Sequence, residues 1–88
     1  MKTVWKVPLE AWNTTVSAVE GAKPLCVQMQ FGAPCLWLEV ESTNPKKEFP
    51  LLILGTGHRM PEGSWNYVGT FQTEAGGIPL VFHVYLGE

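Results

Sequence analysis

The sequence predicts an all-β protein: one small domain, built as a barrel or sandwich from six to seven short, mostly antiparallel strands. Apolar residues alternate with polar ones in several short runs, and glycine, proline and asparagine gather between these runs. No segment keeps the apolar spacing of an amphipathic helix over about ten residues. The chain has 88 residues, so residues 1–88 are expected to share a single core.

The N-terminal part predicts two strands. Residues Thr3–Leu9 place Trp5 and Val7 on one face and lysines on the other, and Pro8 marks the end of this strand or a position at a sheet edge. Residues Thr14–Val19 are rich in β-branched side chains, which favour a second, shorter strand.

The segment Leu25–Glu41 predicts the central β-hairpin of the fold. Two alternating runs flank Gly32-Ala33, which is expected to form the short turn. In the register that this turn sets, Met29 faces Leu36, and the pairs further out continue one wholly apolar face. This face is expected to nucleate the hydrophobic core.

The second face of this hairpin carries Trp37 between polar side chains, Gln28 among them. Stacking on an indole, with amides that read base edges, is a common way to hold a nucleobase, so Trp37 and Gln28 are candidate ligand-binding residues. The same Trp37 could instead pack under another strand or a second subunit. Cys26 and Cys35 are expected on adjacent strands without facing each other, as free thiols in a reducing cytoplasm, with a disulfide between them as the alternative.

The C-terminal half predicts three further strands. Glu48–Leu54 is apolar on both faces, as expected of a central strand buried on both sides, although Pro50 indicates a bulge or an unpaired side. Trp65–Thr73 and Ile78–Leu86 form the last two strands, joined by a hairpin turn at Glu74–Gly77. One face of the first of these two strands is expected to carry Tyr67, Gly69 and Phe71.

Composition and charge exclude several classes of function. Six basic and eight acidic residues give a net charge of −2, and Lys46-Lys47 is the only basic pair, so binding to bulk DNA or RNA is not expected. The longest strongly apolar run, Phe49–Leu54, is too short to span a bilayer, and no signal peptide fits the N-terminal residues. We therefore expect a cytoplasmic protein without a membrane partner. In so small a domain apolar burial and conformational entropy nearly cancel, so a homo-oligomer is expected to supply further stability.

The loop Gly55-Thr56-Gly57-His58-Arg59 is the strongest ligand-binding candidate. Its two glycines allow backbone conformations in which successive N–H groups point into a concavity that suits an anion. The threonine hydroxyl, the imidazole and the guanidinium offer further contacts to a phosphate or carboxylate. The loop lacks the glycine–lysine–serine spacing of a nucleotide-binding P-loop, and it could equally be a turn whose charged side chains are solvated.

Catalysis is not expected. His83 alternates out of an apolar strand and could share a ligand pocket with His58, although a single strand histidine more often has a hydrogen-bonded, structural role. Two cysteines without paired histidines do not form a zinc site, so we expect neither a metal nor a cofactor, and no enzymatic activity. Trp5, Trp12 and Trp65 are expected to be packing residues.

Five segments give the chain a resemblance to a known group of proteins: WKVPL at 5–9, GAKPLCVQMQFGAPCLW at 21–37, GTGHRMP at 55–61, YVGTFQ at 67–72 and LVFHVY at 80–85. Their combination resembles a family of small bacteriophage and prophage proteins. The resemblance implies an accessory phage protein in the cytoplasm of a bacterial host, and it supplies no catalytic residue. Small phage proteins of this size often counter host defence, either by blocking a defence protein or by sequestering its nucleotide signal.

Two functions follow as hypotheses. The first is a non-catalytic binder that sequesters a small anionic ligand, such as a nucleotide signal, with residues 55–59 and aromatic side chains at a subunit boundary. The second is a protein-binding module that covers a host factor or serves in phage assembly through an exposed sheet face or edge.

Overall fold

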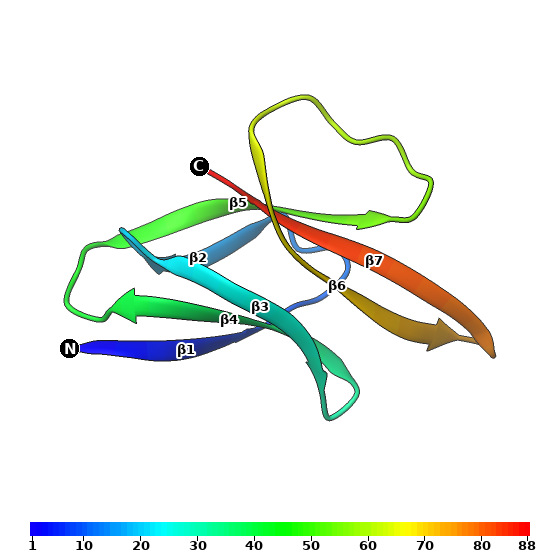
Figure 1. Cartoon of the computed structure of the whole chain (residues 1–88), viewed down its shortest axis with the longest axis horizontal. Helices are drawn as coiled ribbons and strands as arrows, with labels where there is room; N and C mark the ends of the chain where they lie inside the picture. The colour runs from blue at the N-terminus through cyan, green and yellow to red at the C-terminus, as the bar shows by residue number, and fades with distance from the viewer.

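Seven antiparallel strands form two sheets that pack face to face as a β-sandwich (Figure 1). The computed structural model describes residues 1–88. The strands are β1 (Lys2–Pro8), β2 (Thr15–Val19), β3 (Lys23–Gln30), β4 (Ala33–Glu41), β5 (Lys46–Gly55), β6 (Trp65–Ala75) and β7 (Ile78–Gly87). One sheet has the order β1-β4-β3 and the other the order β2-β5-β7-β6. The all-β prediction is confirmed, as a sandwich and not a closed barrel, with strand ends within one or two residues of the predicted ones.

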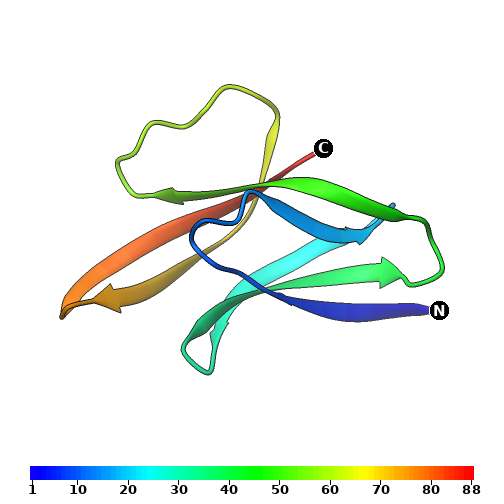
Figure 2. The same cartoon turned by 180° about the vertical axis from the view of Figure 1, so that it is seen from behind.

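The N-terminal strands belong to different sheets. β1 pairs with β4 and β2 pairs with β5, so the connection between them crosses from one sheet to the other, as the rear view in Figure 2 shows. A backbone hydrogen bond holds each end of this connection: Leu9 N donates to Pro34 O, and Leu51 N donates to Thr14 O, both at 2.9 Å. The connection therefore starts beside the β3–β4 turn.

The β3–β4 turn is formed by Phe31-Gly32, and the predicted turn at Gly32-Ala33 is wrong. Both turn residues have positive φ, 51° and 78°, as a two-residue type I′ hairpin turn requires. Met29 consequently pairs with Pro34, two residues away from its predicted partner. Because side chains alternate between faces along a strand, a shift of two residues leaves the paired side chains between the turn and Cys26 on their predicted faces.

A β-bulge in β3 reduces what this strand contributes to the core. The pairing with β4 skips Leu25, which has no partner and is exposed. Met29, nearer the turn, is also exposed, and only Val27 of β3 is fully buried. The prediction of a wholly apolar, buried hairpin face is therefore correct for β4 and wrong for β3.

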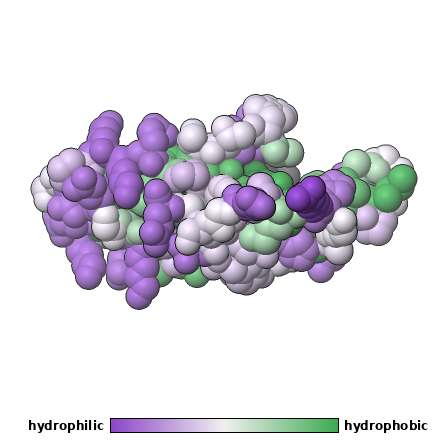
Figure 3. All heavy atoms as spheres, turned by 90° about the horizontal axis from the view of Figure 1, so that it is seen from above, coloured by the Kyte–Doolittle hydropathy of each residue, from purple (hydrophilic) through white to green (hydrophobic).

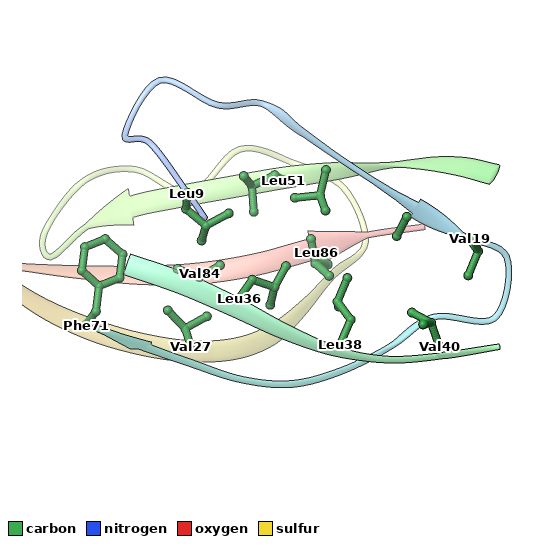
Figure 4. Packing of buried hydrophobic residues seen from close by; sticks show 12 residues of the cluster. Leu9, Val19, Val27, Leu36, Leu38, Val40, Leu51, Phe71, Val84 and Leu86 are labelled. Atoms are coloured by element: carbon green, nitrogen blue, oxygen red, sulfur yellow. The ribbon is translucent and has the colours of Figure 1, made fainter. Parts of the chain in front are cut away.

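The core lies between the sheets and is centred on β4 and β7, which have a neighbouring strand on both sides. In Figure 4, side chains of these two strands extend into the space between the layers and meet there. The most buried of them are Leu36, Leu38 and Val40 of β4 and Val84 and Leu86 of β7. No polar side chain is buried among them, so the core is wholly apolar.

β5 changes its partner half-way along its length. Residues Lys46–Pro50 pair with β2, and residues Leu51–Gly55 pair with β7. Pro50 is the last residue that pairs with β2, and it has no partner in β7. This agrees with the prediction that one side of Pro50 is unpaired, since proline has no N–H to donate. The predicted burial on both faces is wrong: Leu51 is buried in the core, but Leu52 on the outer face is only half-buried because no further layer covers it.

A second β-bulge, at Val68 in β6, separates side chains that were expected on one face. Tyr67 pairs with Tyr85, and their rings meet edge to face with centroids 5.5 Å apart on the outer side of the sheet. Phe71, in contrast, is buried and stacks on Phe82. The predicted common face is therefore wrong, because the extra residue of the bulge reverses the alternation.

Gly69 allows β6 to lie against β3, and this contact closes one side of the sandwich. A Cβ atom at Gly69 would lie 3.1 Å from Val27 N and 3.2 Å from Val27 Cβ, so any side chain would force the two strands apart. The contact covers one edge of each sheet. β1 and β2, at the other edges, have no further strand beside them.

The molecule is flat, and its two ends differ in polarity. The Cα atoms extend over 43 × 32 × 17 Å, and the shortest dimension suits two packed sheets. Figure 3 shows hydrophilic side chains gathered at the end with the N-terminus and the β4–β5 turn, and hydrophobic surface at the opposite end, where the β6–β7 turn lies. Ile78 of that turn is exposed.

Candidate functional site

The predicted ligand residues fall into two groups on opposite sides of the molecule. Thr56 and His83 lie on the outer face of the β2-β5-β7-β6 sheet, whereas Trp37 and Gln28 lie on the outer face of the β1-β4-β3 sheet. The outer faces of a sandwich point away from each other, with the core between them. One pocket of a single chain therefore cannot join the two groups.

His83 is held by hydrogen bonds at both ring nitrogens. Thr56 Oγ1 lies 2.7 Å from its Nε2, and Thr70 Oγ1 lies 3.0 Å from its Nδ1. Tyr67 Oη, 2.6 Å from Thr70 Oγ1, extends this chain of hydrogen bonds along β6. Because Thr56 Oγ1 also donates to Val81 O at 3.4 Å, the consistent arrangement has Nε2 donating to Thr56 and Nδ1 accepting from Thr70. Both ring nitrogens of His83 are thus bonded within the chain, and a ligand-binding role for His83 stays a prediction.

The loop after β5 uses its backbone donors within the chain. Thr56 N donates to Val81 O at 3.2 Å, and His58 N donates to Gly55 O at 3.1 Å. Among residues 56–58 only Gly57, with a φ of 89°, has an N–H without a backbone partner. The expected run of successive free N–H groups is therefore wrong at residues 56–58, because Thr56 N donates to β7 and His58 N donates to the first residue of the loop.

The side chains of this loop are freer than its backbone N–H groups to contact a ligand. The His58 ring lies against Gly55, where a Cβ atom would be 3.0 Å from ring atoms Cε1 and Nδ1, so a side chain at position 55 would displace the ring. Arg59 is exposed and forms no ion pair. A ligand-binding role for the loop stays a prediction, and His58 and Arg59 are the side chains that could serve it.

Trp37 is half-buried on the outer face of β4, between Lys6 of β1 and Cys26 of β3. Lys6 Nζ donates to Gln30 Oε1 at 2.8 Å, so these two side chains reach across β4. Cys35 lies on β4 beneath this contact and is buried although it belongs to the outer face. Both cysteines are free.

We expect iodoacetamide to label Cys26 several-fold faster than Cys35 in the folded protein, because the Lys6–Gln30 contact covers only the second thiol. Lys6→Ala should raise the labelling rate of Cys35 several-fold. Lys2→Ala, on the same face of β1 but at its far end, should leave that rate unchanged. Peptide mass spectrometry of timed samples measures both rates. Equal labelling of the two thiols in the unmodified chain would contradict the proposed cover.

Two aromatic side chains outside the strands are strongly exposed, one in the β3–β4 turn and one in the β1–β2 connection. Phe31 is 98% exposed at that turn. Trp12 is 74% exposed in the β1–β2 connection, which leaves the sheet beside Pro34. Two hydrogen bonds between Glu10 and Asn13, each of 2.9 Å, close the turn that presents Trp12. We call Phe31 and Trp12 the aromatic tip.

The sequence prediction misses both residues of the aromatic tip. It assigns Trp12 to the packing residues, which is wrong, whereas Trp5 and Trp65 are half-buried as expected. It also assigns Phe31 to the end of a strand, because it places the turn one residue later. The signal that identifies Phe31 is a Phe-Gly pair where two-residue hairpin turns usually have Asn-Gly or Asp-Gly.

A family model described as a domain of unknown function, DUF7352, matches residues 1–88. The chain belongs to the DUF7352 family. No curated protein and no solved structure matches it. Both the aromatic tip and the hydrogen bonds around His83 lie within the DUF7352 match. The phage origin that the resemblance implies stays a prediction.

Few ionisable groups of this DUF7352 domain interact with one another. The N-terminal ammonium group of Met1 donates to the Glu41 carboxylate, Thr43 Oγ1 donates to it at 3.0 Å, and these bonds hold the pKa of the Glu41 carboxyl below its ordinary value. No three His, Cys, Asp or Glu side chains come together in a way that could hold a metal ion. The chain has no helix with the length and apolar character needed to cross a membrane.

Proposed function

We propose that this DUF7352 domain is a non-catalytic protein-binding module that contacts its partner through the aromatic tip. The observation that supports this is Phe31, which combines a left-handed backbone, φ 51°, with almost complete exposure. A bulky residue in this backbone region costs on the order of 1 kcal/mol or more, and an exposed ring regains nothing through burial. Folding gives no reason for a phenylalanine here, whereas an apolar pocket on a partner does.

The surroundings of the aromatic tip favour a protein over an anionic membrane or a nucleic acid. Lys6, on the strand that leads to this end, already donates to Gln30, and Glu10 adds a negative charge beside Trp12. Binding to phosphate groups would need several free basic side chains here. Aromatic side chains are instead enriched at protein interfaces.

In the setting implied by the phage resemblance, the partner would be a host factor that the tip covers or another phage protein. The hypothesis of a sequestered anionic ligand at residues 55–59 has less support, because the N–H groups of Thr56 and His58 already donate to carbonyl groups of the chain. The expected homo-oligomer stays a prediction.

Phe31→Asn is expected to raise the free energy of unfolding by about 1 kcal/mol, because asparagine tolerates the left-handed region and Asn-Gly is the preferred type I′ turn. Urea unfolding followed by tryptophan fluorescence measures the change. Ile78→Asn is the matched control: Ile78 is 63% exposed at the β6–β7 turn, and its substitution should change stability by less than about 0.5 kcal/mol. A loss of stability in Phe31→Asn would show that the ring serves the fold.

Binding is tested by photo-crosslinking in bacterial cells with p-benzoylphenylalanine at position 31 and, as the control, at position 78. A protein adduct specific to position 31 is identified by mass spectrometry, and the purified protein is then titrated with the domain. Phe31→Asn should weaken this binding about thirtyfold or more, as expected of a central aromatic anchor, and Ile78→Asn should not. Equal binding of both variants would refute the proposal, as would the absence of an adduct or attachment of the tip to phosphatidylglycerol vesicles instead.

A further inference from the structure

A cavity of about 350 Å³ opens between the two sheets, away from every residue of the aromatic tip. Its walls include the buried side chains Leu38 of β4 and Leu86 of β7 and the half-buried ring of Phe49 on β5. The volume is within the range of about 300–1,000 Å³ that is typical of small-molecule sites. The cavity therefore has the size and the apolar lining for the body of a small ligand.

Lys47 lies at this cavity on the inner side of its sheet. Along β5 it alternates onto the same face as Phe49 and the core residue Leu51. Its Nζ lies 5.0 Å from the centre of the Phe49 ring, and it forms no ion pair with any carboxylate of the chain. An unpaired positive charge thus lies where an apolar wall meets solvent.

Asn66 is a second polar residue on an inner face. It pairs with Leu86 across β6 and β7 and lines the same cavity, and its side-chain amide forms no hydrogen bond within the chain. Inner faces of a sandwich normally carry apolar side chains. Lys47 and Asn66 depart from this pattern, and both are exposed and line the same cavity, so their polar groups are accessible to a ligand that enters it.

We propose that this cavity binds a small amphipathic monoanion, an aromatic or aliphatic carboxylate. The apolar body lies between the sheets against Phe49, Leu38 and Leu86, and the carboxylate accepts hydrogen bonds from Lys47 Nζ and the Asn66 amide. Glu88 also lines the cavity, and its negative charge disfavours a second negative charge on the ligand, so a monoanion is favoured over a phosphate dianion. This site is independent of the protein-binding proposal, which concerns the aromatic tip alone.

The probe is naphthalene-2-carboxylate, with the neutral naphthalene-2-carboxamide as its matched ligand, titrated into the ¹⁵N-labelled domain and followed by amide chemical shifts. Saturable shifts are expected at Phe49, Leu86 and their neighbours. Lys47→Met should weaken the carboxylate about tenfold, the loss of one charge-assisted hydrogen bond, and leave the neutral amide unchanged. Lys46→Met is the control variant, since Lys46 directly precedes Lys47 in β5 and points to the opposite face.

Ala22→Leu tests the cavity without changing any charge. Ala22 lines the cavity and is half-buried, so the larger side chain should fill the cavity and abolish binding of both ligands. Well-dispersed spectra show that each variant is folded. The proposal is overturned if the shifts do not saturate, if they map outside the cavity, or if Lys46→Met weakens the carboxylate as much as Lys47→Met does.

Discussion

Replacing Leu36 by alanine is expected to lower the free energy of unfolding by about 3–4 kcal/mol. Leu36 is 0% exposed at the centre of β4, the middle strand of its sheet, and it faces the core beside Val84 (Figure 4). The substitution removes buried methyl groups and leaves a space that two hydrogen-bonded sheets cannot easily close. Domains of this size are stable by only about 5–15 kcal/mol, so the loss is a large part of the total.

Urea unfolding monitored by tryptophan fluorescence measures this loss. Leu25→Ala is the control: it removes the same atoms from the neighbouring strand, but Leu25 is 47% exposed at the β3 bulge, and the expected loss is below about 0.5 kcal/mol. Similar losses of stability for the two variants would contradict the described difference in burial between Leu36 and Leu25.

Gly69→Val is expected to cost about 2–3 kcal/mol, at the upper end of the range for overpacked positions. The new side chain would meet Val27 N and Val27 Cβ at 3.1 and 3.2 Å. These atoms belong to or adjoin the backbone of β3, so no side-chain rotation relieves the contact and β3 must move away from β6.

The same unfolding measurement tests this prediction, together with hydrogen exchange of the β3 amides, which should become faster. Gln72→Val places the same side chain on β6 at an exposed position and should change stability by less than about 0.5 kcal/mol. Unchanged exchange in β3 after Gly69→Val would contradict the close approach of the two strands.

The pattern of alternation is enough to predict the strands, but not the register of the hairpin. Turns at Phe31-Gly32 and at Gly32-Ala33 differ in register by two residues, and both leave every side chain on the same face, so hydrophobic pattern cannot distinguish them. The bulges at Leu25 and Val68 are also invisible to a pattern, because they depend on how twisted strands meet in space. They decide that Leu25 is exposed and that Tyr67 faces outward.

For the candidate sites, too, the sequence predicts the kind of segment but not the contacts of its single residues. Glycines in the 55–59 loop do indicate a tight turn, but only the folded structure shows that this turn uses the N–H groups of Thr56 and His58. Lys47 belongs to the alternation of β5, yet a predicted strand that starts at Glu48 leaves it in a loop, and its inward direction is missed. The two extra residues at the start of β5 therefore decide whether Lys47 is recognised as a candidate ligand-binding residue.

The order of strands in the two sheets also governs the sequence of events during folding. β3 with β4, and β6 with β7, are joined by two-residue turns and can pair locally as soon as they exist. β1 must wait for β4, and β2 must wait for β5, because their partners are distant in the chain and closing such long loops is slow. During synthesis the N-terminal strands thus emerge first and stay unpaired until β4 and β5 have followed them. Until then their hydrophobic side chains are open to chaperones or to another chain.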